Sequence, residues 1–298
     1  MKQLIACPLC SGPLASHLKS VRSVYSQEKA YDVDRCVTCA CQFTNPCPEE
    51  SDLADLYRNH YGHGEHSLIA EEKVWRARRL LLDLPEARRL LDIGCGEGYL
   101  LEAARSSGYL DSIGVELGST ARANAERKGF RVVPTLGELP RDAGSFDLIV
   151  LQHVLEHLVH DVDQLKEIRK ICSPGGRLVI AVPNPESFTA RWFRSAWGWY
   201  QVPVHLRHYS RQALAGAVKS AGWQLLEEKF SGGDSLFLML TLTRAIGIHP
   251  GPSGSRGSNA FVKAVIGLWS RLTRGYAVIG SEERVWILTP VLDPPGNG

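Results

Sequence analysis

One segment, residues 90–99, constrains the fold of this chain more than any other. Its sequence is Leu-Leu-Asp-Ile-Gly-Cys-Gly-Glu-Gly-Tyr: a short apolar run that predicts a buried strand, then a glycine turn, then a helix over 99–107. The glycines let backbone N–H groups approach a ligand at the N-terminus of that helix. The spacing Gly-x-Gly-x-Gly differs from dinucleotide-binding and phosphate-binding loops, so a different ligand is expected.

Strands and helices alternate through the middle of the chain. Apolar runs predict strands at 89–93, 112–115, 130–133, 146–151 and 177–182, and a last strand at 285–288. Helical patterns occupy 65–84, 119–128 and 162–171. Such alternation is typical of an α/β fold with a parallel sheet covered by helices on both faces. Glu116 follows the second strand, about where a ribose-binding carboxylate stands in this architecture.

Two Cys-x-x-Cys pairs lie near the N-terminus. Cys7 with Cys10, and Cys36 with Cys39, supply four thiolates for a tetrahedral zinc ion, with Cys41 as an alternative ligand. Four thiolates leave no open coordination position, so the zinc is expected to be structural. A module this small also needs such a staple to fold.

The chain is expected to have three parts. These are a zinc-ribbon module at 1–43, a linker at 44–64 and an α/β domain at 65–298. Within the last part, 235–274 is apolar and is expected to form a helical insertion around a Gly/Ser-rich loop. An interfacial membrane element, a piece of the core and a dimer face all remain open for this insertion, and so do a monomer and a homodimer.

The composition excludes several classes of protein. Hydrophobic residues make up 44% and charged residues 22% of the chain, which is ordinary globular composition. The net charge of +2 provides no global field to hold a polyanion. No apolar stretch is long enough to span a membrane, and the N-terminus lacks the apolar core of a signal peptide. A cytoplasmic protein is therefore expected, with contact at the inner face of the membrane left open through 235–274.

Several segments together resemble the class I S-adenosylmethionine (SAM)-dependent methyltransferases. Besides the glycine turn they are 145–149 (Ser-Phe-Asp-Leu-Ile), 153–158 (His-Val-Leu-Glu-His-Leu), 172–176 (Cys-Ser-Pro-Gly-Gly), 182–185 (Val-Pro-Asn-Pro) and 205–210 (His-Leu-Arg-His-Tyr-Ser). Residues 153–158 are similar to the subgroup that includes ubiquinone-biosynthesis O-methyltransferases. The resemblance covers about residues 65–230 and implies a Rossmann-like sheet of seven strands with an antiparallel last strand.

The same resemblance implies SAM as the cofactor. Glu116 is expected at the ribose hydroxyls, Glu138 at the adenine, and the glycine turn around the methionine portion. The residues expected around SAM are Asp92, Gly94, Gly96, Gly98, Glu116, Glu138 and Gln152.

Histidines supply the candidate catalytic groups. Methyl transfer needs an acceptor placed in line with the methyl group, and an acceptor hydroxyl must also lose a proton. His153 is the first candidate base and His205 the second, with His157 as a further catalytic candidate. His153 and His205 could instead bind substrate without taking a proton.

A second metal site is a further hypothesis. His153, Glu156 and His157 fall on one side of a helix. Small-RNA 2′-O-methyltransferases with a Glu-x-x-Glu-His segment and a later His bind a divalent metal there, which implies a site at His153, Glu156, His157 and His205, or with His208 in the last place. The alternative, which the sequence analysis favours, is that His157 caps or packs the loop without metal.

The expected activity is SAM-dependent methyl transfer to a small-molecule or lipid-linked acceptor, at a hydroxyl of a sugar, polyketide or phenolic compound. The Trp-rich segment 191–200 is expected to cover that acceptor. Two alternatives remain: methylation of RNA, because zinc ribbons also accompany ribosomal-RNA guanine methyltransferases, and a SAM-binding module without catalysis. Residues 1–43 hold few basic side chains, which disfavours a nucleic-acid partner.

Overall fold

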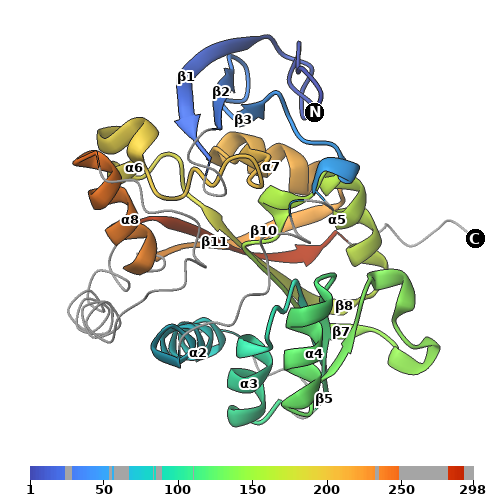
Figure 1. Cartoon of the computed structure of the whole chain (residues 1–298). Helices are drawn as coiled ribbons and strands as arrows, with labels where there is room; N and C mark the ends of the chain where they lie inside the picture. Colours follow the sequence, from blue (N-terminus) through green and yellow to red (C-terminus); the bar gives the residue numbers. More distant parts are fainter. Residues whose placement is uncertain are drawn as a thin grey trace, which may run out of the picture.

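The structure, a computed structural model, describes residues 1–23, 29–53, 56, 67–82, 84, 89–109, 111–231, 235–247 and 281–291. The main strands are β4 (Arg89–Ile93), β5 (Asp111–Val115), β6 (Arg131–Val133), β7 (Phe146–Gln152), β8 (Cys172–Pro183), β10 (Trp223–Ser231) and β11 (Glu283–Pro290). They form a seven-stranded sheet in the order β10-β11-β8-β7-β4-β5-β6 (Figure 1). Because β11 runs antiparallel to both of its neighbours, the expected Rossmann-like sheet is confirmed.

Helices cover both faces of this sheet. One face packs against α2 (Ser67–Leu82), α3 (Tyr99–Ser106) and α4 (Ser119–Arg127), and the other against α5 (Asp161–Lys170) and α7 (Arg211–Ser220). A cluster of buried apolar side chains lies on each face of the sheet. The neighbouring residues Leu90 and Leu91 are both fully buried, Leu90 in the cluster with α2, α3 and α4 and Leu91 in the cluster with α5 and α7. Side chains alternate between the faces of a strand, so a continuous apolar run requires cover on both sides.

A second, smaller sheet carries the N-terminal module. It consists of β1 (Leu14–Arg22), β2 (Ala30–Cys36), β3 (Gln42–Asn45) and β9 (Arg207–His208), in that order. The last strand comes from the methyltransferase-like part of the sequence and pairs with β3 in an antiparallel register. Residues 44 and 45, where the sequence analysis began the linker, therefore lie in this sheet. The sequence did not predict β9, because two residues carry no hydrophobic pattern.

The expected apolar insertion is described in part. Its first helix is α8 (Ser235–Ala245), and residues 248–274 of the insertion lie outside the described residues. The ring of Phe237 stacks on Trp199, with centroids 4.0 Å apart. Among the helices that the structure describes, none has the length and apolar character needed to cross a membrane.

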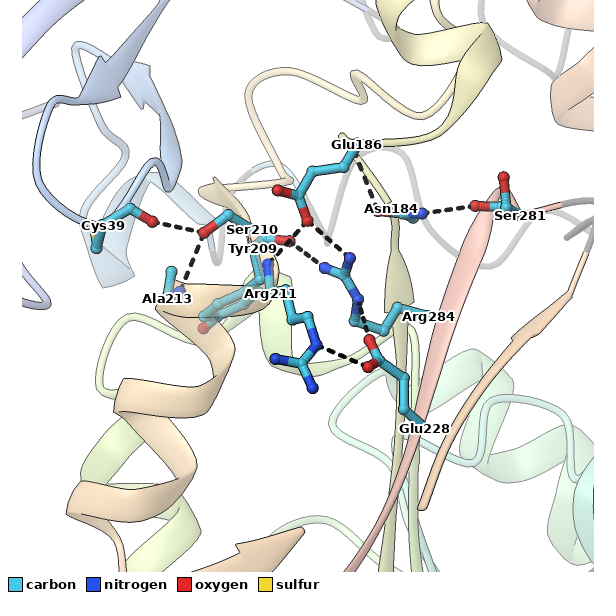
Figure 2. A network of polar contacts seen from close by, with 10 residues as sticks. All are labelled: Cys39, Asn184, Glu186, Tyr209, Ser210, Arg211, Ala213, Glu228, Ser281 and Arg284. Atoms are coloured by element: carbon cyan, nitrogen blue, oxygen red, sulfur yellow. Dashed lines mark hydrogen bonds and ion pairs between the residues drawn. The ribbon is translucent and has the colours of Figure 1, made fainter. Parts of the chain in front are cut away.

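A buried arginine of β11 contacts β10, the segment after β8 and the segment before α7 (Figure 2). Arg284 is 3% exposed, and its Nε donates to Glu228 Oε1 at 3.0 Å while Nη2 donates to Glu186 Oε2 at 2.7 Å. Its Nη1 also donates to the carbonyl of Tyr209 at 3.3 Å. The exposed side chain of Arg211 donates to the other oxygen of Glu228 at 2.8 Å. A buried cation with three acceptors ties β10, β11 and α7 together.

We expect Arg284→Gln to lower the free energy of unfolding by about 3 kcal/mol, because it leaves Glu186 and Glu228 without their buried partner. Arg211→Gln removes an exposed partner of Glu228 alone and is expected to change stability little. Chemical denaturation of both variants measures the difference. Equal losses would show that burial does not decide the value of these ion pairs.

Candidate active site

The glycine turn between β4 and α3 has two positions where only glycine fits. Gly94 has a φ of +71°, and a Cβ there would lie 2.3 Å from Cγ2 of Val154. Gly98, the N-cap of α3, has a φ of +81°, and a Cβ there would lie 2.9 Å from Cδ2 of Phe130. Neighbouring side chains fill the space of a Cβ at both positions, so glycine is required for this tight turn at the N-terminus of α3.

Glu116, directly after β5, closes the other side of this turn. Its Oε2 accepts the N–H of Gly96 at 2.9 Å, and its Oε1 accepts the N–H of Gly118 at 2.6 Å. Asp92 is buried in β4, where burial and the charge of Glu116 raise its pKa well above the usual value. The structure thus gathers Asp92, the turn and Glu116 at the carboxyl ends of adjacent strands, where open α/β sheets bind ligands.

The other two residues expected around SAM, Gln152 and Glu138, lie at the carboxyl ends of different strands of the sheet. Gln152 ends β7, next to β4 and its glycine turn. Glu138 lies in η1 (Leu136–Glu138) after β6, the edge strand, where it is exposed and accepts a hydrogen bond from Thr135 Oγ1 at 3.0 Å. Gln152 therefore stands beside the histidines described next, and Glu138 stands apart from them.

His153 follows Gln152 with a φ of 55°, an unusual conformation for a residue other than glycine. Its Nε2 donates to Glu283 Oε1 at 2.8 Å, and its Nδ1 lies 3.4 Å from Glu156 Oε1. Burial opposes the charged form, but the two carboxylates raise the pKa of His153 to about 9. The candidate base that the sequence predicts thus lies between two carboxylates, which favour its protonated form.

Glu283 is the centre of these contacts. It begins β11, is 3% exposed, and accepts hydrogen bonds from Arg76 of α2 and from Ser231 Oγ, the latter at 2.5 Å. Burial alone would raise its pKa, but Arg76 and His153 hold the pKa of Glu283 well below its usual value. The carboxylate is charged and joins α2, β10 and the end of β7.

A second group lies on the other side of His153. One ligand atom each of Glu156, His157 and His205 lies within 4.8 Å of the others. Glu156 is fully buried, and neither of its carboxylate oxygens has a hydrogen-bond partner among the residues that the structure describes. Burial lowers the pKa of both imidazoles, which keeps them neutral. Three of the four residues expected at a second metal thus come together, while His153 is directed to Glu283 instead.

The neutral imidazole of His205 is oriented by its neighbours. Its Nδ1 donates to the carbonyl of Trp199 at 2.9 Å, which leaves Nε2 to face Glu156 Oε1 at 3.9 Å. Trp199 also stacks on His153, with ring centroids 4.7 Å apart. Buried carboxylate oxygens without donors and neutral imidazoles are the donor set of a divalent metal, so these residues fit one.

A pocket adjoins Glu283 between α2 and the sheet. Leu80 of α2 and Val285 and Ile287 of β11 form its apolar wall. The polar lining comes from Gln152, Ser231 and Glu283, with Arg76, Arg79 and Lys229 as cationic residues. The pocket therefore offers apolar contact area next to charged and hydrogen-bonding groups, as small-molecule sites commonly do.

The four cysteines of the two pairs gather as expected. The Sγ atoms of Cys7 and Cys39 are 3.6 Å apart, those of Cys10 and Cys36 are 3.5 Å apart, and all four lie within 4.8 Å of one another. A tetrahedral zinc with Zn–S bonds of about 2.3 Å has sulfur–sulfur edges of about 3.8 Å. Cys41 lies outside this group, with its Sγ 3.4 Å from the carbonyl of His208. The thiol set fits a structural zinc.

Three residues of the site were missed by the sequence analysis. Glu283, Arg76 and Ser231 come from segments far from the glycine turn, and none carries a motif. One signal was available: Glu282, Glu283 and Arg284 stand directly before an apolar run that predicts a buried strand. Charges at such a position need partners inside the protein.

A family model described as a methyltransferase domain matches residues 67–228, more than half of the 298 residues. The chain is 32% identical over 106 residues to the ubiquinone biosynthesis O-methyltransferase of Caulobacter sp., covering 33% of this chain and 42% of that protein. It is 29% identical over 154 residues to the enzyme of the same name from Xanthomonas axonopodis pv. citri, covering 47% and 64%. The chain thus spans less than two thirds of the length of these curated relatives.

A solved structure, that of the cyclase SpnF, has a TM-score of 0.53 and 18% sequence identity, and the match covers 83% of this chain and 98% of that one. At this identity the likeness shows the fold alone. The family match, the glycine turn and the seven-stranded sheet support the same conclusion. The chain belongs to the methyltransferase-domain family and has the fold of class I SAM-dependent methyltransferases.

Proposed function

We propose that this enzyme transfers the methyl group of SAM to a hydroxyl of an apolar small-molecule or lipid-linked acceptor, with a phenolic hydroxyl favoured over sugar and polyketide hydroxyls. The pocket beside Glu283 carries the proposal, because its apolar wall suits a ring or chain while its polar lining adjoins His153. The relatives' name, ubiquinone biosynthesis O-methyltransferase, supports oxygen as the methylated atom.

On the cofactor side, we propose that the turn at Gly94, Gly96 and Gly98 with Asp92 holds the methionine portion of SAM. Glu116 binds the ribose, with Gln152 and Glu138 as further contacts. The support is geometric: a carboxylate fixed by two backbone N–H groups stands beside an open turn at a helix N-terminus. SAM supplies an electrophilic methyl group on a sulfonium.

On the acceptor side, the chain's own groups position the hydroxyl and take its proton. The methyl carbon passes from sulfur to the acceptor oxygen. The proton of that hydroxyl goes to the minor, deprotonated fraction of His153, because a pKa of about 9 leaves most of the imidazole protonated at neutral pH. Glu283 and Glu156 stabilise the imidazolium that results, since both carboxylates face the ring. His205 and His157 lie on the other side of Glu156, with ligand atoms within 4.8 Å of its carboxylate.

Placement in the cytoplasm, with contact at the membrane surface, belongs to the same proposal. Trp192 of α6 (Phe188–Phe193) is 70% exposed, and Ile246, just after α8, is 72% exposed. Exposed apolar side chains of this size favour an interaction surface, which a membrane carrying a lipid-linked acceptor or a second protomer would cover.

Methyl-labelled SAM tests the acceptor class. The enzyme is incubated with labelled SAM and a lysate depleted of this protein, and RNA, protein, organic-soluble and aqueous fractions are counted. We expect label in the organic-soluble fraction, and Glu116→Ala is expected to abolish it by weakening SAM binding at least about tenfold. Label in RNA contradicts the proposal, and bound SAM without transfer to any fraction supports a binding module.

Substitution of His153 tests the acceptor side separately. We expect His153→Gln to lower turnover of the labelled acceptor by about 100-fold while the dissociation constant for SAM stays within about twofold, because His153 contacts the acceptor side only. Isothermal titration measures SAM binding, and His160→Gln, at an exposed histidine, is the matched control. Unchanged turnover would remove His153 as the catalytic group.

We also propose that the protein binds two metal ions, and metal analysis tests both. We expect about two metal equivalents per chain, zinc at the four cysteines and a divalent ion at Glu156, His157 and His205. Cys39→Ser is expected to remove the first and Glu156→Gln the second, each measured by mass spectrometry of the purified protein. A single equivalent, lost only in Cys39→Ser, shows that Glu156 and the imidazoles pack without metal.

A further inference from the structure

The acceptor-side segment 199–210 is held by the zinc module. Thr44 of β3 is fully buried, and its Oγ1 donates to the carbonyl of His205 at 2.7 Å. The backbone N–H of Thr44 donates to the carbonyl of Leu206 at 3.1 Å. Tyr200 donates from its hydroxyl to Gln42 Oε1 at 2.5 Å. The strand that follows the zinc ligands therefore satisfies polar groups along this segment.

A zinc ligand itself contacts the end of the segment. Ser210 Oγ donates to the carbonyl of Cys39 at 2.5 Å and accepts the N–H of Ala213 at 3.0 Å, which caps α7 (Figure 2). The buried cysteines of the module belong to the same apolar cluster as the core residues of α5 and α7. The module thus packs directly against the main core through buried side chains, in addition to its covalent connection.

The opposite side of the segment contacts the site. The N–H of Leu206 donates to the carbonyl of Glu156 at 2.9 Å. The ring of His205 donates to the carbonyl of Trp199, whose own ring stacks on His153. An unbroken series of contacts runs from the zinc-binding loop through Thr44 and His205 to Glu156 and His153.

We propose that the zinc-loaded module is a working part of the acceptor side, in which Thr44 is a positioning residue for His205. The proposal rests on the proposed function for the acceptor side, whereas the cofactor side is built from β4, α3 and β5 without residues of the module. Loss of zinc releases β3, because a module this small has little core of its own. The carbonyls of His205 and Leu206 then lose their buried donors, and the segment shifts.

Thr44→Val tests the positioning role with the zinc ligands intact. Valine keeps the volume but removes the donor to His205, so we expect acceptor turnover to fall about tenfold with zinc content and SAM affinity unchanged. Thr44→Ser restores the hydroxyl and is expected to restore turnover. Thr289→Val, which removes a similar bond to the carbonyl of Gly176 at the far end of β11, is the matched control. Full turnover in Thr44→Val, or no rescue by Thr44→Ser, overturns the role.

Hydrogen exchange of the full chain, before and after zinc is removed with a chelator, tests the coupling without an acceptor. We expect amides 205–208 to lose protection at least about tenfold while the amides of β4 and α3 keep theirs and SAM still binds. Unchanged protection at 205–208 overturns the proposal, and so does loss of SAM binding together with protection everywhere. If the native enzyme transfers no methyl group, the proposed function fails, and this exchange result still decides the coupling.

Discussion

Two consecutive buried charges, Glu283 and Arg284, connect the helices on the two faces of the main sheet. Successive side chains of a strand point to opposite faces, so β11 sends its carboxylate toward α2 and its guanidinium toward α7. Each finds opposite charges: Glu283 meets Arg76 and His153, and Arg284 meets Glu186 and Glu228. Burial of either charge alone would be costly, so the antiparallel strand fits between β8 and β10 only with both sets of partners in place.

This arrangement explains why the site is charged although it lies over an apolar core. The carboxylates of Glu283 and Glu156 flank one imidazole, and together they favour its protonated form against the effect of burial. His205 lies within 4 Å of the same Glu156 but remains neutral, because neighbouring imidazoles add to the effect of burial. Of two histidines beside the same carboxylate, one therefore favours the protonated form and the other the neutral form, and the neighbouring groups decide which.

The parts of the structure that the sequence predicted are those coded by local pattern. The glycine turn, the apolar strands on both sides of it and the two cysteine pairs follow from spacing within short segments, and the structure places all of them as expected. What escaped prediction depends on contacts between distant segments. Glu283 lies 130 residues from the His153 that it contacts, and β9 owes its existence to a partner strand 160 residues away or more. No local pattern encodes such pairings.

The same distinction between local pattern and distant contacts separates the proposed cofactor side of the site from the proposed acceptor side. The proposed cofactor side takes most of its residues from one stretch, Asp92 to Glu116, and only Gln152 and Glu138 come from later elements. The proposed acceptor side is made of α2, the end of β7, the Trp-rich segment, β11 and the cysteine module, which meet around one imidazole. Because in-line methyl transfer tolerates little misplacement, an acceptor site made of so many pieces requires rigid connections between them. In this proposal the sheet that joins β3 to β9 is one such connection, and it links the four-cysteine cluster to the acceptor side.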